Sequence, residues 1–364
     1  MIIELLELQN FRNYETERIQ FDEKTNIFFG DNAQGKTNIL EAIYMAGTTK
    51  SHKQSKDAEM IRFGMDEAHI KAIVHKKEIE YRIDLHLRKQ RSKGIAVNGV
   101  PIRKSSDLFG IVNLVFFSPE DLSIIKSGPA GRRKFMDMEL CQLNPMYVQE
   151  LIGYNKVLNQ RNQLLKDLYF NPSLRDTLEV WDNQLCRYGC DIIGIRQNFI
   201  QKLDEIIGEI HRKLTGGKEE LHVTYEPNVR EQEFARELEA SRIRDEKLKT
   251  TNVGPHRDDI LFTVGDIDIR KYGSQGQQRT AALSLKLAEI ELVKEVTGDT
   301  PILLLDDVLS ELDHNRQNYL LDSIHDIQTI ITCTGLDEFV KNRFQINRVY
   351  QVTNGHVDQT LTQQ

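Results

Sequence analysis

The pattern of hydrophobic and polar positions near the start of the chain indicates short β-strands. Apolar residues dominate 2–8, a more polar run follows at 15–21, and a third, apolar run lies at 25–29. Short runs of this kind, rich in β-branched and aromatic residues, are typical of strands. We expect the first two runs to pair as a hairpin and the third to lead into a glycine-rich turn.

Further short strands are predicted downstream, at 68–75, 78–87, 94–97 and 100–102. The last two flank Asn98-Gly99, a dipeptide that favours a two-residue hairpin turn. The apolar run 111–117 is typical of a buried strand. We expect it to end at Ser118-Pro119, because proline cannot donate a hydrogen bond to a neighbouring strand.

The pattern changes to a helical period in the middle of the chain. Within 148–168, and again from about 174 to 214, apolar residues recur every three or four positions. This spacing places them on one face of a helix. Two such helices packed antiparallel would form an arm roughly 40–60 Å long. We therefore interpret 129–249 as an inserted α-helical lobe.

The strand signal returns after residue 250. Strands and one long helix are predicted there, at 260–264, 266–270, 277–296, 302–307 and 329–334. The two ends of the chain, 1–128 and 250–364, are thus predicted to form one discontinuous head around the inserted lobe.

A phosphate-binding P-loop follows the third strand. The motif G-x-x-x-x-G-K-[ST] is met by Gly30, Asp31, Asn32, Ala33, Gln34, Gly35, Lys36 and Thr37. Its glycines allow the backbone N–H groups to surround a polyphosphate, and the helix that begins there adds its positive dipole end. Lys36 is expected to reach the β- and γ-phosphates, and Thr37 to bind Mg²⁺. The sequence therefore predicts a site for a nucleoside triphosphate.

Two carboxylates, Asp306 and Asp307, end the apolar run that begins at Ile302. The carboxyl ends of buried parallel strands are where α/β folds place their ligands. We expect Asp306 to complete the Mg²⁺ site and Asp307 to act on the attacking water. The alternative is a pair of helix-capping residues. The P-loop in the same chain favours the catalytic interpretation.

A second anion-binding candidate is Ser274, Gln275, Gly276 and Gln277, placed just before the predicted helix at 277–296. A hydroxyl, a glycine and an amide at a helix N-terminus suit phosphate oxygens. The same residue types are also ordinary helix caps. Its place one helix before the Asp306 strand favours a role at the nucleotide site.

Charge identifies a possible DNA-binding surface. The chain carries a net charge of −7, but residues 71–104 hold ten basic and three acidic side chains, a local net charge of +7. This stretch is either a solvated hairpin face or a surface that contacts DNA phosphates without reading sequence. Candidate DNA contacts are Arg88, Lys89, Arg91, Lys93, Arg132 and Arg133.

The remaining composition fits a globular protein, with 39% hydrophobic and 28% charged residues. No run is long and apolar enough to span a bilayer, and no signal-peptide pattern is present, so we expect a cytoplasmic location. We interpret Cys186 and Cys190 as buried free thiols rather than as a metal pair. For His256, a turn with internally satisfied polar groups is favoured over catalysis.

The order of these motifs resembles the ABC-type ATPase heads. More closely, the chain resembles the RecF family of bacterial recombination mediators, which is related to the heads of Rad50 and SMC proteins. The resemblance is carried by segments that span nearly the whole chain, at 10–14, 30–42, 254–259, 272–279 and 303–313.

The resemblance implies an α/β fold: an ABC/SMC-type P-loop head, with a mixed sheet, flanking helices and an antiparallel β lobe, carrying an inserted helical arm. It implies that Arg12 and Asn13 lie near ATP. It also implies that residues 274–277 contact the γ-phosphate of ATP held by a second copy of the chain. ATP would then hold a homodimer together, and hydrolysis would release it.

The implied function is ATP-dependent binding to single- and double-stranded DNA and their junctions in recombinational repair and replication, with RecR and RecO as partners in loading a recombinase. A weak, DNA-stimulated ATPase is expected, because Asp307 stands where ABC heads usually carry Glu. The Gln expected after 111–117 and the His expected after 329–334 are absent. The alternative function is the ATPase subunit of a membrane transporter. A GTPase is disfavoured, because Asn155-Lys156-Val157-Leu158 lacks the Asp of a guanine-reading motif.

Overall fold

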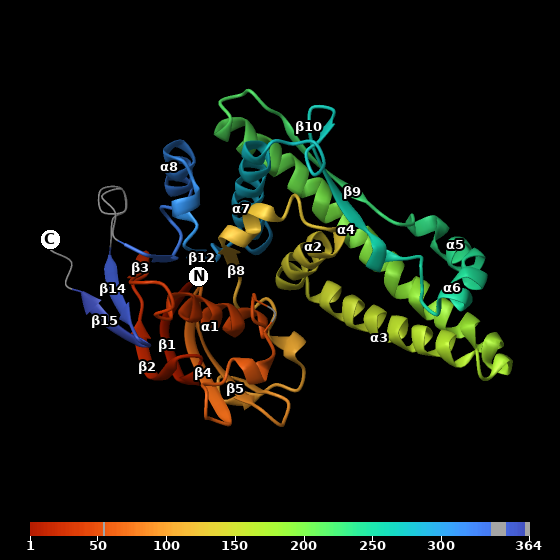
Figure 1. The fold of residues 1–364 in the computed structure, drawn as a ribbon, viewed down its shortest axis with the longest axis horizontal. Helices are drawn as coiled ribbons and strands as arrows, with labels where there is room; N and C mark the ends of the chain where they lie inside the picture. Colours follow the sequence, from red (N-terminus) through yellow and green to blue (C-terminus); the bar gives the residue numbers. More distant parts are fainter. Residues whose placement is uncertain (54, 336–346, 361–364) are drawn as a thin grey trace. The chain divides into compact units, whose positions relative to one another are not determined.

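The computed structural model describes residues 1–53, 55–335 and 347–360 (Figure 1). The chain divides into two compact units. The first combines Met1–Leu122 with Leu285–Gln364, and the second is Ser123–Ser284. The first unit is therefore built from both ends of the chain.

One sheet of the first unit is antiparallel and has the strand order β2-β1-β4-β5-β6-β7. Its strands are β1 (Ile2–Phe11), β2 (Tyr14–Gln20), β4 (Glu67–Lys76), β5 (Ile79–Arg88), β6 (Gly94–Val97) and β7 (Val100–Pro101). Along β4 the side chains alternate between buried and solvent-facing, so one face of this sheet belongs to the core and the other faces water. The hairpin expected at the N-terminus is β1 paired with β2.

The other sheet of the first unit is mixed, with the order β15-β14-β3-β13-β12-β8. Its strands are β3 (Thr25–Phe29), β8 (Leu114–Phe117), β12 (Ile302–Asp306), β13 (Thr329–Cys333), β14 (Arg348–Thr353) and β15 (His356–Thr360). All neighbours pair in parallel except β14 and β15. The parallel core strands are buried on both faces, which explains their continuous apolar sequence.

Helix α1 (Lys36–Thr48) packs against strands of both sheets of this unit. A helix covered on both sides needs apolar residues around most of its circumference. Most of its residues are buried accordingly, including Glu41. Helix α8 (His314–Ser323) follows β12, and the side chain of Asp313 accepts hydrogen bonds from the first backbone N–H groups of α8.

The second unit is mainly helical, with α2 (Pro129–Leu143), α3 (Pro145–Asp167), α4 (Leu178–Leu214), α5 (Phe234–Ala240) and α6 (Arg242–Leu248). Helices α3 and α4 pack along each other and form the predicted arm. The start of α3 is fixed by Pro145 and by the Asn144 side chain, which accepts from two backbone N–H groups.

The second unit is larger than the expected insert of 129–249. It also contains a three-stranded sheet of β9 (Leu221–Glu226), β10 (Asp259–Val264) and β11 (Ile267–Asp268). Because β10 pairs with β9 along its whole length, the strand signal after residue 250 belongs first to this unit and not to the head. Helix α7 (Gln275–Thr297) begins in the second unit and ends in the first.

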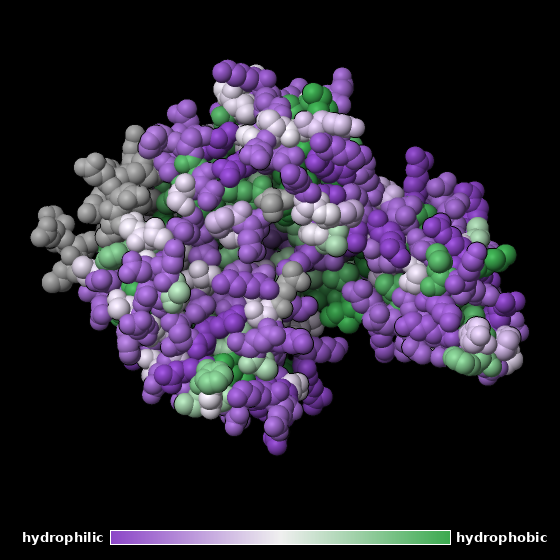
Figure 2. Space-filling model, in the orientation of Figure 1, coloured by the Kyte–Doolittle hydropathy of each residue, from purple (hydrophilic) through white to green (hydrophobic). Residues whose placement is uncertain are grey.

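Most residues on the face drawn in Figure 2 are hydrophilic. In the part of the chain that the structure describes, no helix combines the length and the apolar character that crossing a membrane requires.

Two glycines of α4 give a matched test of how the second unit packs. A Cβ at Gly189 would overlap the ring of Phe234, a fully buried side chain at the start of α5. A Cβ at Gly194 would meet nothing closer than 3.7 Å. We expect Gly189→Ala to lower the thermal unfolding temperature. We expect Gly194→Ala to raise stability by about 0.5–1 kcal/mol, because alanine is the better helix former. Equal effects of the two substitutions would contradict this packing.

Candidate functional site

The P-loop connects β3 to α1 at one edge of the mixed sheet. Strand β13 pairs with β3 on one side and β12 on the other, and Thr332 stands opposite both Phe28 and Asp306. The carboxyl ends of all three strands therefore meet beside the loop. This is the position where open α/β sheets bind ligands.

Hydrogen bonds join the three strand ends. The Asp306 carboxylate accepts from the Thr37 hydroxyl at 2.9 Å and from the Thr332 hydroxyl at 2.7 Å. The next backbone N–H, of Asp307, donates to the Thr332 carbonyl at 3.1 Å. A hydroxyl and a carboxylate oxygen side by side are the hard oxygen donors that Mg²⁺ prefers, so Thr37 and Asp306 fit a magnesium site.

The Lys36 side chain is buried within the loop. Its ammonium group donates to the carbonyls of Gly30 and Asp31. Gly30 and Gly35 both have positive φ, at 153° and 116°. Ala33 also has a positive φ, of 64°, where a side chain is disfavoured. The loop thus has the tightly turned backbone that the glycine pattern predicts.

Neighbouring segments hold the loop in this conformation. The Asn13 side chain donates to the Gln34 carbonyl at 2.8 Å, and the buried Tyr14 hydroxyl donates to the Gly35 carbonyl at 3.1 Å. A Cβ at Gly35 would collide with both side chains. Asn13 therefore contacts the backbone of the P-loop, and its place near ATP stays a prediction.

The turn between β14 and β15 supports the loop from another side. The Gly355 N–H donates to the Gln34 carbonyl at 3.1 Å, and the Asn354 N–H donates to the Gln34 side-chain carbonyl at 2.6 Å. A Cβ at Gly30 would collide with the Val352 carbonyl of β14. This C-terminal hairpin was not predicted, although its Asn354-Gly355 dipeptide is a strong turn signal in the sequence.

The Arg12 side chain is bonded to helix α1 and to the segment that follows it. Its guanidinium forms two hydrogen bonds with Glu41, at 2.8 and 2.7 Å, and further bonds with the Ser55 hydroxyl and the Glu59 carbonyl. Burial alone would raise the pKa of Glu41, but hydrogen bonds from Arg12 and Ser51 outweigh it and lower the pKa. The structure therefore shows Arg12 fixing the segment after α1 to that helix.

Asp307 lies at the carboxyl end of β12 with a φ of 52°. Partial burial raises the pKa of its carboxyl group; Lys36 acts in the opposite direction, and Asp306 and Glu311 raise it further. A carboxylate with a raised pKa is a better proton acceptor than an ordinary aspartate. This environment suits the hydrolytic role expected for Asp307.

The segment after β8 lies where the missing Gln was expected. Strand β8 pairs with β12 so that Phe117 stands opposite Leu305, which brings Ser118 alongside Asp306. The Asp121 carboxylate accepts from the backbone N–H and the hydroxyl of Ser118, and an ion pair at 3.7 Å joins it to Lys286. Polar groups are therefore present at this position without the Gln.

The Ser274–Gln277 segment lies in the second unit and begins α7. The Ser274 N–H donates to the Gln277 side chain at 2.9 Å, and the Gln277 N–H donates to the Ser274 hydroxyl at 3.2 Å. This reciprocal pair is a capping box. The Gln277 amide also donates to Glu219 at 2.9 Å. Ser274, Gln275 and Gly276 are exposed, so they are accessible to another molecule.

The basic residues after β5 have different environments. Lys93 is mostly buried, donates to the Thr49 carbonyl and forms an ion pair with Asp57 at 2.9 Å. Lys89 pairs with Asp66 at 3.2 Å on the surface. Arg88, the last residue of β5, contacts the His86 ring, and Arg91 is exposed in the loop after it. Lys93 is thus mainly a structural residue, whereas Lys89 and Arg91 are accessible.

Arg132 and Arg133 do not offer a free basic surface. Arg132 is only 4% exposed and forms a two-pronged ion pair with Asp259, at 2.6 and 2.9 Å. Arg133 donates to the Asp258 carbonyl at 2.8 Å, and burial lowers the pKa of its guanidinium. The expected DNA contact through Arg132 is not supported, because that side chain is buried and its charge is already paired.

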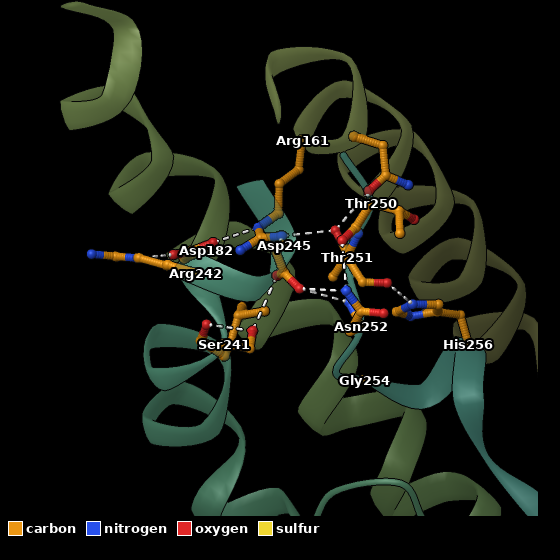
Figure 3. Close-up of polar contacts among 12 residues, drawn as sticks. Arg161, Asp182, Ser241, Arg242, Asp245, Thr250, Thr251, Asn252, Gly254 and His256 are labelled. Atoms are coloured by element: carbon orange, nitrogen blue, oxygen red, sulfur yellow. Dashed lines mark hydrogen bonds and ion pairs between the residues drawn. The ribbon is translucent and has the colours of Figure 1, made fainter. Parts of the chain in front are cut away.

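The Gly254–Asp259 stretch is part of a buried polar network in the second unit. Figure 3 shows the centre of this network, where Arg161 donates to Asp182 at 2.6 Å and to Asp245 and Thr251 at 2.8 Å. Arg161 has no exposed surface. An uncompensated charge in that position would be costly, so the two carboxylates are needed to balance it.

His256 is held by the same network. Its Nε2 atom contacts the Thr251 carbonyl at 3.0 Å (Figure 3). Its Nδ1 atom contacts the Tyr154 hydroxyl at 2.7 Å. Burial lowers the pKa of His256 to about 4, against the effect of the Thr251 carbonyl. Both ring nitrogens are therefore used within the protein, which agrees with the expected satisfied turn and gives no sign of catalysis.

Asp258 anchors the end of this stretch. The side chain accepts from Arg196 at 2.7 Å, from the Asn228 N–H at 2.8 Å and from the Tyr225 hydroxyl. Arg196 and Arg161 were not predicted as important, since each is one charged residue within a long amphipathic helix. One sequence signal could have identified both residues: each arginine falls on the apolar face of its predicted helix, where a charged side chain needs a buried partner.

Comparison with known proteins agrees with this geometry. The family of RecF, RecN and SMC N-terminal domains matches residues 2–358. The chain is 63% identical to the DNA replication and repair protein RecF of Agathobacter rectalis over 358 residues, covering 98% of this chain and 99% of that protein. It is 61% identical over the same length to RecF of Lachnoclostridium phytofermentans. The chain belongs to the RecF family.

Solved structures share the fold of this RecF-family chain. A structure of the recombination mediator protein RecF with ATP, from the RecFOR pathway, has a TM-score of 0.93 at 34% identity and covers 99% of this chain and 97% of that one. An SMC head has a TM-score of 0.58 at 17% identity, covers 99% of this chain and 97% of that head, and shows the shared fold alone. The ABC/SMC-type head expected from the sequence is confirmed.

The support that the β14–β15 turn gives to the RecF P-loop can be tested at Gly355. Its φ is 78°, and a Cβ would lie 2.5 Å from the Asn13 carbonyl oxygen. We expect Gly355→Ala to shift the loop and weaken ATP binding on the order of tenfold, measured by calorimetry. Gly298→Ala is the control, because Gly298 has a similar φ of 64° but no neighbour within 4 Å. Equal affinities for the two variants would contradict a supporting role.

The environment of His256 predicts a dependence of stability on pH. Because its pKa is about 4 in the folded chain and near 6.5 when unfolded, only the unfolded state binds a proton between these values. Stability is therefore lost as the pH falls from about 7 toward 4. We expect the urea unfolding free energy of His256→Gln to fall less between pH 7 and pH 5 than that of the parent, by up to about 2 kcal/mol. If the unfolding free energies of parent and variant changed equally with pH, the inference that His256 stays neutral in the folded chain would be wrong.

Proposed function

We propose that the chain is an ATP-controlled DNA-binding protein that acts in DNA replication and recombinational repair. The observation that carries the proposal is the joining of Thr37, Asp306 and Thr332 beside the P-loop in a chain of the RecF family. Relatives with 61–63% identity are named DNA replication and repair proteins. Solved relatives at 34–35% identity carry ATP or an analogue in their names.

In the proposed mechanism, residues 30–37 surround the phosphates of ATP. Lys36 already points its ammonium group at loop carbonyls, and it would exchange those contacts for the β- and γ-phosphate oxygens. Thr37 and Asp306 would hold Mg²⁺, which neutralises phosphate charge when bound. Asn13 and the β14–β15 turn position the loop, and Arg12 positions α1.

Asp307 is proposed to accept a proton from the attacking water. Its raised pKa supports this role. The aspartate side chain is one methylene shorter than the glutamate usual in ABC heads, so its reach toward that water is smaller. We therefore expect slow, DNA-stimulated hydrolysis that acts as a switch.

The Ser274–Gln277 segment, in which residues 274–276 are exposed, is proposed to contact ATP held by a second copy of the chain. The capping box supports this, because it fixes the segment at the start of a 23-residue helix and leaves exposed donors there. ATP would then favour a homodimer, and hydrolysis would favour its dissociation. DNA binding by this dimer would use phosphate contacts, with Lys89 and Arg91 as accessible cations.

RecO and RecR are proposed partners in loading a recombinase onto DNA, in a cytoplasmic pathway. This proposal is supported by the family and by solved relatives described within the RecFOR pathway. The alternative of a transporter ATPase subunit is not favoured, because the relatives at 61–63% identity are DNA repair proteins.

ATP-dependent dimerisation can be tested by light scattering of Ser274→Arg. We expect ATP to double the molar mass of the parent and to leave the variant monomeric, because a bulky cation would block the contact across the dimer. Ser173→Arg carries the same substitution at another exposed serine of the second unit and is expected to dimerise like the parent. Lys36→Ala is expected to lose both ATP binding and dimerisation.

Dimerisation of Ser274→Arg to the same extent as the parent would show that this segment does not contact a second copy. A parent that binds ATP and stays monomeric at all ATP concentrations would overturn the dimer itself.

A further inference from the structure

The solvent-facing side of the antiparallel sheet carries two histidines that stack on each other. His69 of β4 and His86 of β5 stand directly opposite in the strand register. Their ring centroids lie 4.0 Å apart, with an angle of 23° between the ring planes. His69 is exposed and His86 is half-buried, so both rings are accessible from solvent. The apolar core of the first unit therefore does not account for this pair.

A carboxylate completes a group of three side chains. Glu67 lies two positions before His69 on the same face of β4, which places it diagonally across from His86. Its carboxylate contacts the His86 Nε2 atom at 2.7 Å. One nitrogen or oxygen atom from each of the three side chains lies within 4.8 Å of the other two. Three ligand atoms on one tetrahedral metal ion lie about 3.4 Å apart, so small side-chain rotations are sufficient to bind one.

The donor set identifies the class of ion. Two imidazole nitrogens and one carboxylate suit Zn²⁺ and similar transition metals, whereas Mg²⁺ and Ca²⁺ prefer oxygen ligands alone. Tetrahedral Zn²⁺ with three protein ligands keeps its fourth position for water. We propose that Glu67, His69 and His86 form a zinc-binding site on the solvent-facing side of the β4–β5 hairpin. Its ligands differ in kind from the hydroxyl and carboxylate oxygens expected to hold Mg²⁺ beside the P-loop.

The charges around His69 favour the form of the ring that binds a metal. Desolvation by neighbouring side chains lowers the pKa of His69, and the adjacent His86 lowers it further. The carboxylates of Glu67 and Asp84 act in the opposite direction. A metal ion binds the neutral imidazole, so the lowered pKa leaves a nitrogen lone pair available at neutral pH. The two carboxylates also attract a cation to this face.

Arg88 competes with a metal ion for the His86 ring. Its Nε and Nη2 atoms lie 3.3 and 3.2 Å from His86 Nδ1. A guanidinium only donates, so Nδ1 is the acceptor and the ring proton is on Nε2, where it is donated to Glu67. Zn²⁺ at Nε2 requires that this proton move to Nδ1, and Arg88 must then leave the ring. Zinc binding and the Arg88–His86 contact are therefore mutually exclusive.

The same sheet provides a matched control. In the part of the chain that the structure describes, one other group of possible ligands comes as close together: Glu4, His75 and Glu80. His75 lies on the same strand as His69, six positions further on, which is roughly 20 Å along β4. This second group has a single imidazole, so we expect it to bind Zn²⁺ more weakly. His75→Ala thus removes the same residue type from the same face without touching the proposed site.

Calorimetry of the metal-free, full-length chain with Zn²⁺ alone tests the site. We expect the parent to show one strong site, and Mg²⁺ at the same concentration not to compete for it. His69→Ala and His86→Ala are expected to weaken Zn²⁺ binding at least a hundredfold, because altering residues that only support metal ligands already costs about ten- to a hundredfold. His75→Ala is expected to bind like the parent.

Arg88→Gln gives a change of opposite sign. This variant removes a repelling charge and the competing contact, so Zn²⁺ affinity is expected to rise by roughly twofold to fivefold, the range that a surface charge contact is worth. A merely structural histidine pair would show no such gain. Co²⁺ in place of Zn²⁺ reports the coordination directly: we expect the visible absorption of tetrahedral Co²⁺ with the parent and with His75→Ala, and not with His69→Ala.

Thermal unfolding separates loss of metal from loss of fold. Without metal, His69→Ala is expected to melt like the parent, because its ring lies on the solvent-facing side. Excess Zn²⁺ ties β4 to β5 and is expected to raise the unfolding temperature of the parent and not of this variant. If an alanine variant did not fold, the comparison of Arg88→Gln with the parent would still decide the question.

Three results would overturn the zinc site: a parent that binds no Zn²⁺, binding that survives both His69→Ala and His86→Ala, or binding that is lost in His75→Ala. The last result would place the ion at the second group. ATP and DNA do not enter these measurements, so the zinc site is tested independently of the proposed function.

Discussion

The hydrogen bonds from Thr37 and Thr332 to one oxygen of Asp306 are the constraint on which the head depends. They join residues that are far apart in the sequence, from α1 and from strands β12 and β13. These bonds form only if the parallel strands end at the same level. The register of the strands therefore determines the geometry of the site. Substitutions that alter the register would therefore change the nucleotide site before they changed the outer surface.

The second unit is fixed by a different kind of interaction. Arg161, Arg196 and Arg132 are almost fully buried, and each has carboxylate partners from another element. Buried ion pairs add little net stability, since desolvation opposes the attraction between the charges. Breaking one is nevertheless costly, because a single buried charge remains. These networks therefore specify which helices and loops pack together, including the Gly254–Asp259 stretch.

The sequence predicted the features that depend on local pattern. The P-loop, the hairpin at Asn98-Gly99, the long helices and the strand ending at Asp306 all follow from hydrophobic period and turn residues. The extent of the second unit was not predictable in this way, because it depends on β10 pairing with β9 across an intervening helical segment. The burial of Arg132 was missed for the same reason, since its partner Asp259 lies 127 positions away. Pairings between distant residues leave little trace in local composition.

The positive φ of Asp307 limits which side chains that position can carry. Asparagine and aspartate tolerate the left-handed region better than other residues with a Cβ, because their short polar side chains can bond locally. Glutamate would add both length and backbone strain there. The backbone conformation thus favours aspartate over glutamate at this position. Asparagine is the replacement that removes the charge while keeping the conformation. An alanine or glutamate variant would confound loss of chemistry with a local change in the main chain.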